Sequence, residues 1–381
     1  MVSLLAAALI AAGPAAGARP PLQVVSALPR FLAPGATLVV RGWTGRAFGV
    51  RLVLGGQAVD TTTSGRLGGF TLRVTASRPG RYVVAVAAPG ERRQVGTLVV
   101  RPLVLAAAGD VNLGDAVAAA IASYGPRYPW LSVAPVLRGA DLATANLECA
   151  VSSRGLPVPN KPFTFRGPPS ALEAAADFAG LDVLSLANNH SLDYGRPAFF
   201  DTLALVRAAG IASVGGGQSL AAARRPAILS AGGLRLAFLG YSDINPPGFT
   251  AGSSWPGTAP ADTEAVATDV RAARRRADLV VVWFHWGIEL DRYPGGRQQE
   301  LAAAALNAGA TVVLGAHPHV LQPIVRPAPG RIVAWSLGNF VFPPHSPGTD
   351  RTGVLLIKLG ASGVRGHLFR PARIVGVQPR L

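Results

Sequence analysis

The chain has 381 residues, 49% of them hydrophobic and 15% charged, a globular composition long enough to bury two separate cores. Its 45 glycines and 32 prolines interrupt short apolar runs, which excludes a coiled coil and an all-helical bundle. The formal net charge of +16 favours anionic neighbours such as cell-wall polymer or phospholipid head groups. Nucleic acid is disfavoured, because the sequence has no zinc-finger spacing, RNP-like aromatic motif or basic recognition helix.

Residues 1–20 hold an apolar run that is too short for a membrane-spanning helix and ends in small residues around Ala15 to Ala18. This pattern predicts a secretion signal and an extracytoplasmic protein. Because no basic residue precedes Arg19, an uncleaved N-terminal anchor is the alternative. A single cysteine, Cys149, excludes an intrachain disulfide and is interpreted as a small core residue.

Residues 22–101 contain short β-branched runs between turn residues, at a spacing of roughly ten residues. This spacing predicts a small antiparallel, immunoglobulin-like β-sandwich domain. Residues 1–101 carry 12 arginines against only Asp60 and Glu91, and they contain no cluster of histidine, cysteine or carboxylate side chains. We therefore expect a spacer or an interaction module here. The runs are ATLVVRGW, GVRLVLGG, GGFTLRVTA, GRYVVAVAA and QVGTLVVRP.

From residue 102 to residue 381, apolar strand-like runs alternate with alanine-rich helical stretches. Such alternation predicts an α/β domain with substantial parallel strand pairing. The helical stretches are residues 171–178, 199–209, 263–277 and 298–307.

Five of these apolar runs are each followed directly by a potential metal ligand. Because parallel strands end at the same edge of a sheet, the ligands are expected to meet there. LVLAAAG leads to Asp110, DLATAN to Glu148, DVLSLAN to Asn189 and His190, LVVVWF to His285, and TVVLGA to His317 and His319.

Taken singly, most of these residues also fit structural roles. Asp110 fits a turn or helix cap, Glu148 an ion pair, Asn189 a helix cap, and His285 a hydrogen-bonded core histidine. Two histidines in a row around a proline, His317-Pro318-His319, have little structural purpose. Oxygen ligands mixed with neutral imidazoles suit Mn, Fe or Zn better than Ca or Mg. Two such ions can share a bridging carboxylate and activate a water as nucleophile.

The motifs, in this order, resemble the CapA family, the poly-gamma-glutamate capsule branch of the calcineurin-like metallophosphoesterase superfamily. The resemblance covers roughly residues 104–345 and does not include the N-terminal domain. The matching stretches are GDVNLG, ANLECAVS, FTFRGPPSALEAA, LANNHSLDYG, FHWGIE followed by RQQELA, GAHPHVLQPI and WSLGNFVF.

The resemblance implies a metallophosphatase-like β-sandwich flanked by helices, with two divalent metal ions at the strand ends. It also implies that His190 stabilises the transition state or protonates the leaving group, oriented by Asp193. Carried onto this sequence, the ligand set is Asp110 and His319 for the first metal, Asn189, His285 and His317 for the second, and Glu148 as the bridge.

The sequence departs from the wider superfamily at two of these positions. Asn112 stands where a histidine ligand is usual, and Glu148 stands in place of an aspartate. A site that holds a single metal is therefore an alternative to the dinuclear one.

Two functions are compatible with these features. The first is an extracytoplasmic metal-dependent hydrolase that acts on a phosphoester or an amide in an anionic envelope polymer such as poly-gamma-glutamate. The second is a non-catalytic accessory of capsule polymer synthesis, export or tethering, with a structural or vestigial metal site. Because neither His190 nor Asp193 is needed merely to hold metal, their presence favours the hydrolase. The expected partners are the polymer or a phosphorylated substrate, the membrane surface and capsule-synthesis proteins.

Overall fold

The computed structural model describes residues 22–45 and 47–381 and contains two compact units. The first unit has the described residues up to Phe31, Thr37–Ala76 and Gly80–Val100; the second has Leu32–Ala36, Ser77–Pro79 and Arg101–Leu381. The signal segment predicted for residues 1–20 lies outside the described residues. None of the helices in the described ranges has the length and apolar composition of a membrane span.

The first unit consists of two antiparallel sheets, in the orders β1-β2-β5 and β4-β3-β6-β7. In β5, buried Phe70, Leu72 and Val74 alternate with exposed residues, as in a strand with one face on a core. The predicted small β-sandwich is thus confirmed. The strands are β1 (Gln23–Val24), β2 (Thr37–Trp43), β3 (Gly49–Leu54), β4 (Gln57–Thr63), β5 (Gly69–Thr75), β6 (Gly80–Ala88) and β7 (Glu91–Val100).

The second unit contains an eight-stranded mixed sheet in the order β13-β12-β9-β8-β23-β24-β25, with β22 also paired to β8. Its first four strands are parallel, and β23, β24 and β25 are antiparallel to their neighbours. The strands are β8 (Leu103–Val111), β9 (Leu142–Leu147), β12 (Val183–Ser185), β13 (Ala212–Val214), β22 (Asn339–Val341), β23 (Arg351–Gly360), β24 (Gly363–Val375) and β25 (Gln378–Arg380).

A six-stranded sheet in the order β15-β16-β18-β19-β21-β20 forms the other half of this unit. Every residue of β18 is buried, as expected for a central parallel strand covered on both faces. The strands are β15 (Ala227–Ala231), β16 (Leu234–Ser242), β18 (Leu279–His285), β19 (Val312–Ala316), β20 (Ile324–Val325) and β21 (Ile332–Ala334). Two small pairs join β10 (Ala150–Val151) to β11 (Arg166–Gly167), and β14 (Gly216–Gly217) to β17 (Gly257–Thr258).

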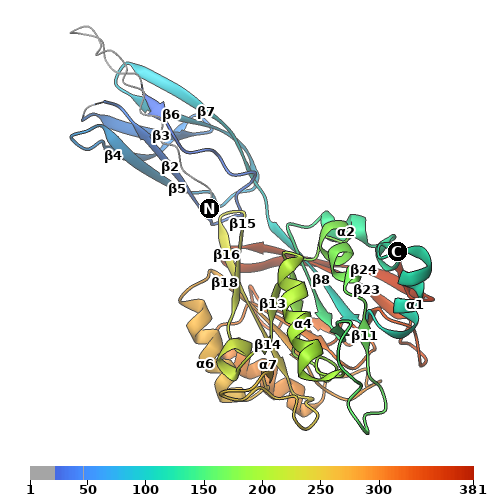
Figure 1. Ribbon diagram of the computed structural model, residues 1–381. Helices are drawn as coiled ribbons and strands as arrows, with labels where there is room; N and C mark the ends of the chain where they lie inside the picture. The colour runs from blue at the N-terminus through green and yellow to red at the C-terminus, as the bar shows by residue number, and fades with distance from the viewer. Residues whose placement is uncertain (1–21, 46) are drawn as a thin grey trace. The chain divides into compact units, whose positions relative to one another are not determined.

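The two large sheets pack on each other, and helices cover their outer faces (Figure 1). The indole of Trp283 on β18 donates a hydrogen bond to Thr144 Oγ1 on β9, at 2.9 Å, across the buried interface between the sheets. The helices are α1 (Asp115–Tyr124), α2 (Ala134–Arg138), α3 (Ser170–Glu173), α4 (Gly195–Ala208), α5 (Leu220–Ala223), α6 (Thr263–Arg274) and α7 (Gly296–Ala308), with a 3₁₀ turn at Tyr128–Trp130 and a π turn at Ala174–Phe178.

Local sequence explains why the longer helices form where they do. Asp262 caps α6 by accepting a hydrogen bond from the Ala265 N–H, and Val266, Val270 and Ala273 follow at helical spacing on the buried face. At the end of α7, Gly309 adopts the left-handed conformation (φ 111°) that commonly ends helices. These caps confirm the predicted helices in both regions.

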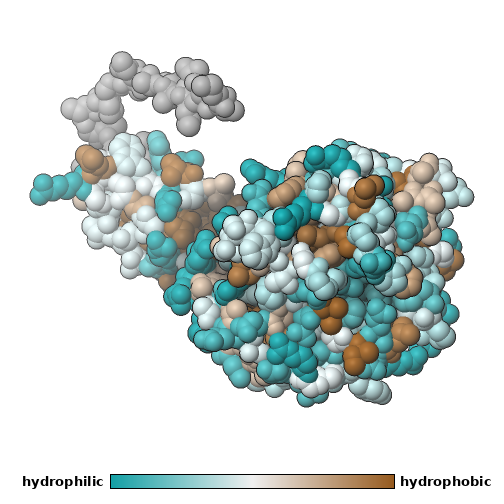
Figure 2. Space-filling model, turned by 60° about the horizontal axis from the view of Figure 1, so that its bottom comes forward, coloured by the Kyte–Doolittle hydropathy of each residue, from teal (hydrophilic) through white to brown (hydrophobic). Residues whose placement is uncertain are grey.

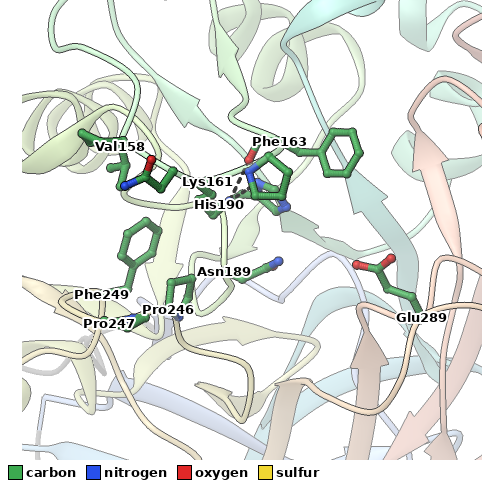
Figure 3. A pocket seen from close by; sticks show the side chains of 12 residues that line it. Val158, Lys161, Phe163, Asn189, His190, Pro246, Pro247, Phe249 and Glu289 are labelled. Atoms are coloured by element: carbon green, nitrogen blue, oxygen red, sulfur yellow. Dashed lines mark hydrogen bonds between the residues drawn. The ribbon is translucent and has the colours of Figure 1, made fainter.

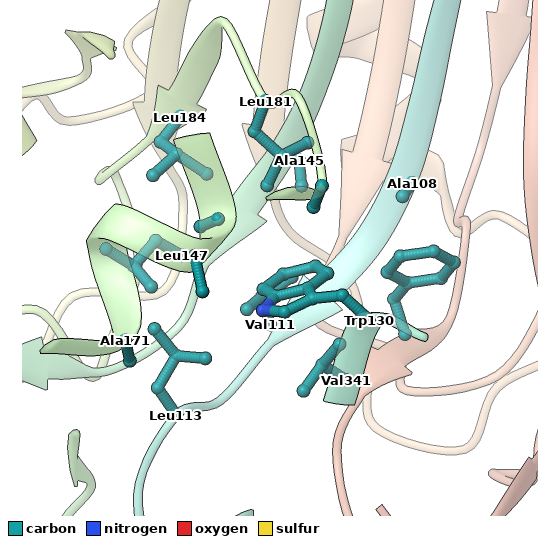
Figure 4. Close-up of a cluster of buried hydrophobic side chains, with 14 of the residues drawn as sticks. Ala108, Val111, Leu113, Trp130, Ala145, Leu147, Ala171, Leu181, Leu184 and Val341 are labelled. Carbon is teal, nitrogen blue, oxygen red and sulfur yellow. The ribbon is translucent and has the colours of Figure 1, made fainter. Parts of the chain in front are cut away.

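One hydrophobic core lies between the eight-stranded sheet and the helices that cover it. This core surrounds the fully buried Trp130 (Figure 4). Figure 4 shows Val111, Leu147 and Val341 around the indole, from three strands that end at the same edge. Cys149 belongs to this core, and burial raises the pKa of its thiol to about 12. Its interpretation as a core residue is confirmed.

The surface of the molecule is mixed in character (Figure 2). On the face shown, hydrophobic residues occur singly or in small groups between hydrophilic ones. Scattered exposed apolar side chains of this kind are ordinary on folded proteins.

Candidate metal centre

The structure brings all six predicted ligands to one edge of the packed sheets. Asp110 is the next-to-last residue of β8, Glu148 follows β9, and His285 ends β18. Asn189 lies four residues after β12, and His317 and His319 come directly after β19.

Two sets of buried side chains have ligand atoms that all lie within 4.8 Å of one another. One set is Glu148, His285 and His317, and the other is Asp110, Glu148 and His319. Glu148 belongs to both sets, so its two carboxylate oxygens can serve two neighbouring ions. These buried clusters can therefore bind metal ions.

The chemistry of Glu148 fits a cation. Its side chain is fully buried, and within the described residues neither oxygen has a hydrogen-bond partner. The nearby basic atoms are His285 Nε2 at 3.4 Å and His319 Nε2 at 4.0 Å from Oε1. A buried carboxylate without hydrogen bonds is unfavourable unless a positive charge lies beside it.

Burial shifts the pKa values of the ligands in opposite directions. It raises the pKa of Asp110 to about 7, against the lowering effect of the Asn146 hydrogen bond, and raises that of Glu148 well above its usual value, with Asp110 adding to the effect. Desolvation also lowers the pKa of His317 to about 4 and of His319 to about 3. Desolvation thus favours neutral imidazoles that can coordinate a metal, and it favours the protonated form of the carboxyl groups, whose protons a cation would displace.

Metal binding is expected to release protons from the carboxyl groups and not from the histidines. For the Asp110 proton, Mn²⁺ affinity should rise with pH by up to about tenfold per pH unit below about 7, the pKa of that carboxyl, and level off above it. Calorimetric titration in buffers of different ionisation enthalpy counts these protons. Asp110→Asn should release one proton fewer than the wild type, and an affinity independent of pH would contradict the expectation.

A second layer of amide side chains orients the ligands. Asn146 Nδ2 donates to Asp110 Oδ1 at 2.9 Å, and Asn188 Nδ2 donates to Asn146 Oδ1 at 3.2 Å. His319 Nδ1 lies 2.8 Å from Asn339 Oδ1, which leaves Nε2 free for a metal. The sequence interpretation included none of these three asparagines among the site residues.

Asn189 lies beside the set of Glu148, His285 and His317, with its Oδ1 2.7 Å from His285 Nε2. The other nitrogen of that ring, Nδ1, lies 3.3 Å from Asn146 Nδ2. His285 is thus held from both sides within a buried environment, and its pKa is lowered well below the usual value, mainly by desolvation.

His190 and Asp193 form a buried pair next to the ligands. His190 Nδ1 is 2.6 Å from Asp193 Oδ2, which also accepts a hydrogen bond from the Phe165 N–H at 2.7 Å. The Phe165 ring stacks on the imidazole, with centroids 4.2 Å apart. Desolvation lowers the pKa of His190, opposed by the Asp193 hydrogen bond. Asp193 thus lies within hydrogen-bond distance of His190, and its predicted role in orienting the imidazole stays a prediction.

Lys161 contacts both members of this pair. The sequence interpretation did not include Lys161. Its Nζ lies 2.7 Å from Asp193 Oδ1 and 2.9 Å from His190 Nδ1. A signal for it was available, because Lys161 and Lys358 are the two lysines of a chain with 36 basic residues. The ammonium group balances the buried Asp193 charge.

Two cavities adjoin the centre and share His190, Phe163 and Glu289 in their walls. The larger one, of about 520 Å³, is shown in Figure 3, where Glu289 lies across from Asn189 and His190. A Glu289 oxygen lies within 4.8 Å of ligand atoms of His317 and His319. The sequence interpretation quoted Glu289 only as part of a motif.

The backbone of the histidine pair is unusual. His317 has φ 95° and His319 has φ 59°, a region that non-glycine residues rarely adopt and that is found mostly at functional sites. The His317 N–H lies 3.2 Å from Asp110 Oδ2, which ties this loop to the first ligand.

Curated proteins from two bacteria are similar to this chain over more than half of its length. PGA biosynthesis protein CapA of Bacillus subtilis (strain 168) is 35% identical over 236 residues, which are 61% of this chain and 62% of that protein. Capsule biosynthesis protein CapA of Bacillus anthracis is 33% identical over 247 residues, 63% of this chain and 60% of that protein. The chain thus spans less than two thirds of the length of these curated relatives.

Solved structures show weaker similarity. A 5'-nucleotidase precursor from Thermus thermophilus has a TM-score of 0.41 and 12% identity, covering 73% of this chain and 56% of that chain. The fibronectin(III)-like modules of Clostridium thermocellum CbhA have a TM-score of 0.19 and 14% identity, covering 24% of this chain and 55% of that chain.

The family described as bacterial capsule synthesis protein PGA_cap matches residues 104–344. This range is more than half of the chain and includes every predicted metal ligand together with His190 and Asp193. The resemblance inferred from the motifs is thereby confirmed, and the chain belongs to the PGA_cap family of bacterial capsule synthesis proteins.

Proposed function

We propose that this protein is an extracytoplasmic, metal-dependent hydrolase of the CapA type. It would cleave a phosphoester or an amide during synthesis or processing of an anionic envelope polymer such as poly-gamma-glutamate. The observation that carries the proposal is the buried Glu148, which two ligand sets share, beside a His190–Asp193 pair whose imidazole lines two cavities. A protein that only holds metal for structure needs neither the pair nor the cavities.

The residues of the chain would divide the work as follows. Two divalent ions, with Mn, Fe or Zn best suited to these ligands, would polarise the scissile group and lower the pKa of a water. Asp193 holds His190 through Nδ1, so Nε2 is the nitrogen that can pass a proton to the leaving group. The stacked Phe165 keeps the imidazole in place.

The second candidate is a non-catalytic accessory of capsule polymer synthesis, export or tethering. The observation that favours it is the strongly basic N-terminal part, with 12 arginines and two acidic residues in residues 1–101. Relatives from Mycobacterium tuberculosis, 32% identical over 211 residues, are named probable polyglutamine synthesis accessory proteins. On either candidate we propose association with capsule-synthesis machinery at the cell envelope.

The deciding experiment is to purify the full chain, measure its bound metals by elemental analysis, and assay it against phosphoesters, poly-gamma-glutamate and peptidoglycan fragments. Metal-dependent turnover of one class would support the hydrolase. Two bound metals with no turnover across the panel would make the accessory function the better conclusion.

The N-terminal unit is expected to bind anionic polymer weakly, through charge alone. Residues 22–101 should bind poly-gamma-glutamate at low salt and release it at high salt, because surface charges are screened within about 8 Å at physiological ionic strength. Retention on immobilised polymer measures the effect, with an uncharged polymer as control. Exposed Arg66 and Arg92, replaced together by glutamine, should weaken retention. Equal retention at both salt concentrations would argue against charge as the cause.

A further inference from the structure

The smaller cavity, of about 230 Å³, lies at the mouth of the metal centre. Its walls include His190 and the ligand His319, together with the aromatic rings of Phe165 and Phe342. A molecule bound there would reach both the metal ligands and the imidazole proposed to protonate the leaving group. The polar groups of its walls therefore bear on the choice of substrate.

Asn112 lines this cavity directly after β8 and is fully buried. Its Oδ1 accepts a hydrogen bond from the Gly114 N–H at 2.8 Å, whereas Nδ2 has no hydrogen-bond partner within the described ranges. This bond fixes the orientation of the amide, because the reversed amide would set two donors against each other. Nδ2 is thus a buried donor that needs an oxygen from a bound molecule.

The orientation of the Asn112 amide also bears on whether this residue holds a metal ion or binds the substrate. The wider superfamily usually has a histidine ligand where Asn112 stands. Within the part of the chain that the structure describes, the Asn112 atom without a partner is Nδ2, and an amide NH₂ group donates hydrogen bonds and does not coordinate metal. Nδ2 is therefore assigned to the substrate and not to a metal ion.

Apart from the proposed metal ions, which would attract phosphate, the described cavity walls offer an anion no cationic partner. Two carboxylates, Asp115 and Glu289, line the cavity, and its described walls contain no lysine or arginine. Lys161, in the adjoining cavity, is paired with Asp193 at 2.7 Å. A phosphate would therefore be repelled by two carboxylates at the mouth of the centre, whereas a neutral amide would not.

We propose that this cavity binds an amide bond, with Asn112 Nδ2 donating to the carbonyl oxygen and Glu289 accepting from the N–H. The inference rests on the proposed hydrolase function and selects its amide branch. An amide has one acceptor and one donor to match these groups, while a phosphoester has acceptors only. In the reaction the water oxygen bonds to the carbonyl carbon and one water proton passes to His190; the C–N bond then breaks with its electron pair on nitrogen, and His190 passes that proton to the nitrogen. The products are a carboxylic acid and an amine.

The first test compares γ-glutamyl-p-nitroanilide with p-nitrophenyl phosphate on the full, Mn²⁺-loaded chain. The wild type should have the higher kcat/KM on the anilide. Asn112→Asp keeps an acceptor for Gly114 and removes the donor, so kcat/KM on the anilide should fall about 100-fold or more, as for a lost oxyanion-hole donor. Its metal content should not change. Asn307→Asp, at an exposed position of α7, is the matched control.

The second test measures binding of inorganic phosphate by calorimetry. Glu289→Gln should bind phosphate about tenfold more tightly than the wild type and cleave the anilide more slowly; the exposed Glu264→Gln in α6 is the control. A higher kcat/KM on the phosphoester, or loss of metal from Asn112→Asp, would overturn the inference. If the wild type cleaves neither of these substrates nor any other in the panel named above, the hydrolase proposal fails, and the phosphate titration alone decides: unchanged binding in Glu289→Gln overturns the cavity assignment.

Discussion

Glu148→Ala is expected to empty the metal centre and abolish hydrolysis together. Glu148 is the one carboxylate common to both ligand sets, so its removal takes a ligand from each ion at once. Elemental analysis of the purified variant, with hydrolysis rates on the same preparation, measures both effects. Metal content should fall to the background of the chelated protein.

Glu173→Ala is the matched control for this variant, because Glu173 is exposed in α3 and away from the ligands. It should keep its metal and its activity. A Glu148→Ala protein that is folded by circular dichroism and still holds both ions would contradict the bridging role. A variant that loses one ion only would favour a terminal ligand over a bridge.

His190→Ala should separate metal binding from chemistry. The imidazole belongs to neither ligand set, so the ions should remain, while turnover should fall about 100-fold or more through loss of a general acid. The defect should shrink on substrates whose leaving groups need no proton. Elemental analysis and rates on activated and unactivated substrates measure the two properties.

Two further variants serve as comparisons for His190→Ala. Asp193→Asn should show a smaller defect in the same direction, since it would misorient the ring without removing it. His367→Ala, at an exposed position of β24, should behave as the wild type. If His190→Ala loses metal as completely as Glu148→Ala, His190 is a ligand or a structural residue and its proposed role is wrong.

The meeting of the predicted ligands at one edge was predictable because their positions are tied to local sequence signals. Each apolar run ends within a few residues of its ligand, and parallel pairing of β8 with β9 and of β18 with β19 places those ends together. Gly109 also helps to place Asp110. A Cβ at this position would lie 1.8 Å from the Gly338 oxygen. The glycine lets β22 approach and leaves Asp110 at the edge.

The supporting residues depend on long-range pairing that no local pattern reveals. Asn339 reaches His319 because its strand pairs with β8 in the register Asn339 to Asp110. Asn146 reads as the polar end of an apolar strand, and only the packing of the two sheets directs it toward Asp110 and His285. Strand β4 was not predicted. Its residues, QAVDTTT, are all half-exposed or exposed, so they lack the apolar alternation that marks a strand with one buried face.

The left-handed backbone conformation of His317 and His319 has a consequence for how this site would bind metal ions. Pro318 restricts the turn between these two residues, so little further ordering would be needed when a cation binds. Such preorganisation favours rapid capture and slow release. A loop of fixed shape does not adjust to ions of different radius. Ions of different size should therefore bind with different affinities while the conformation of the loop stays the same.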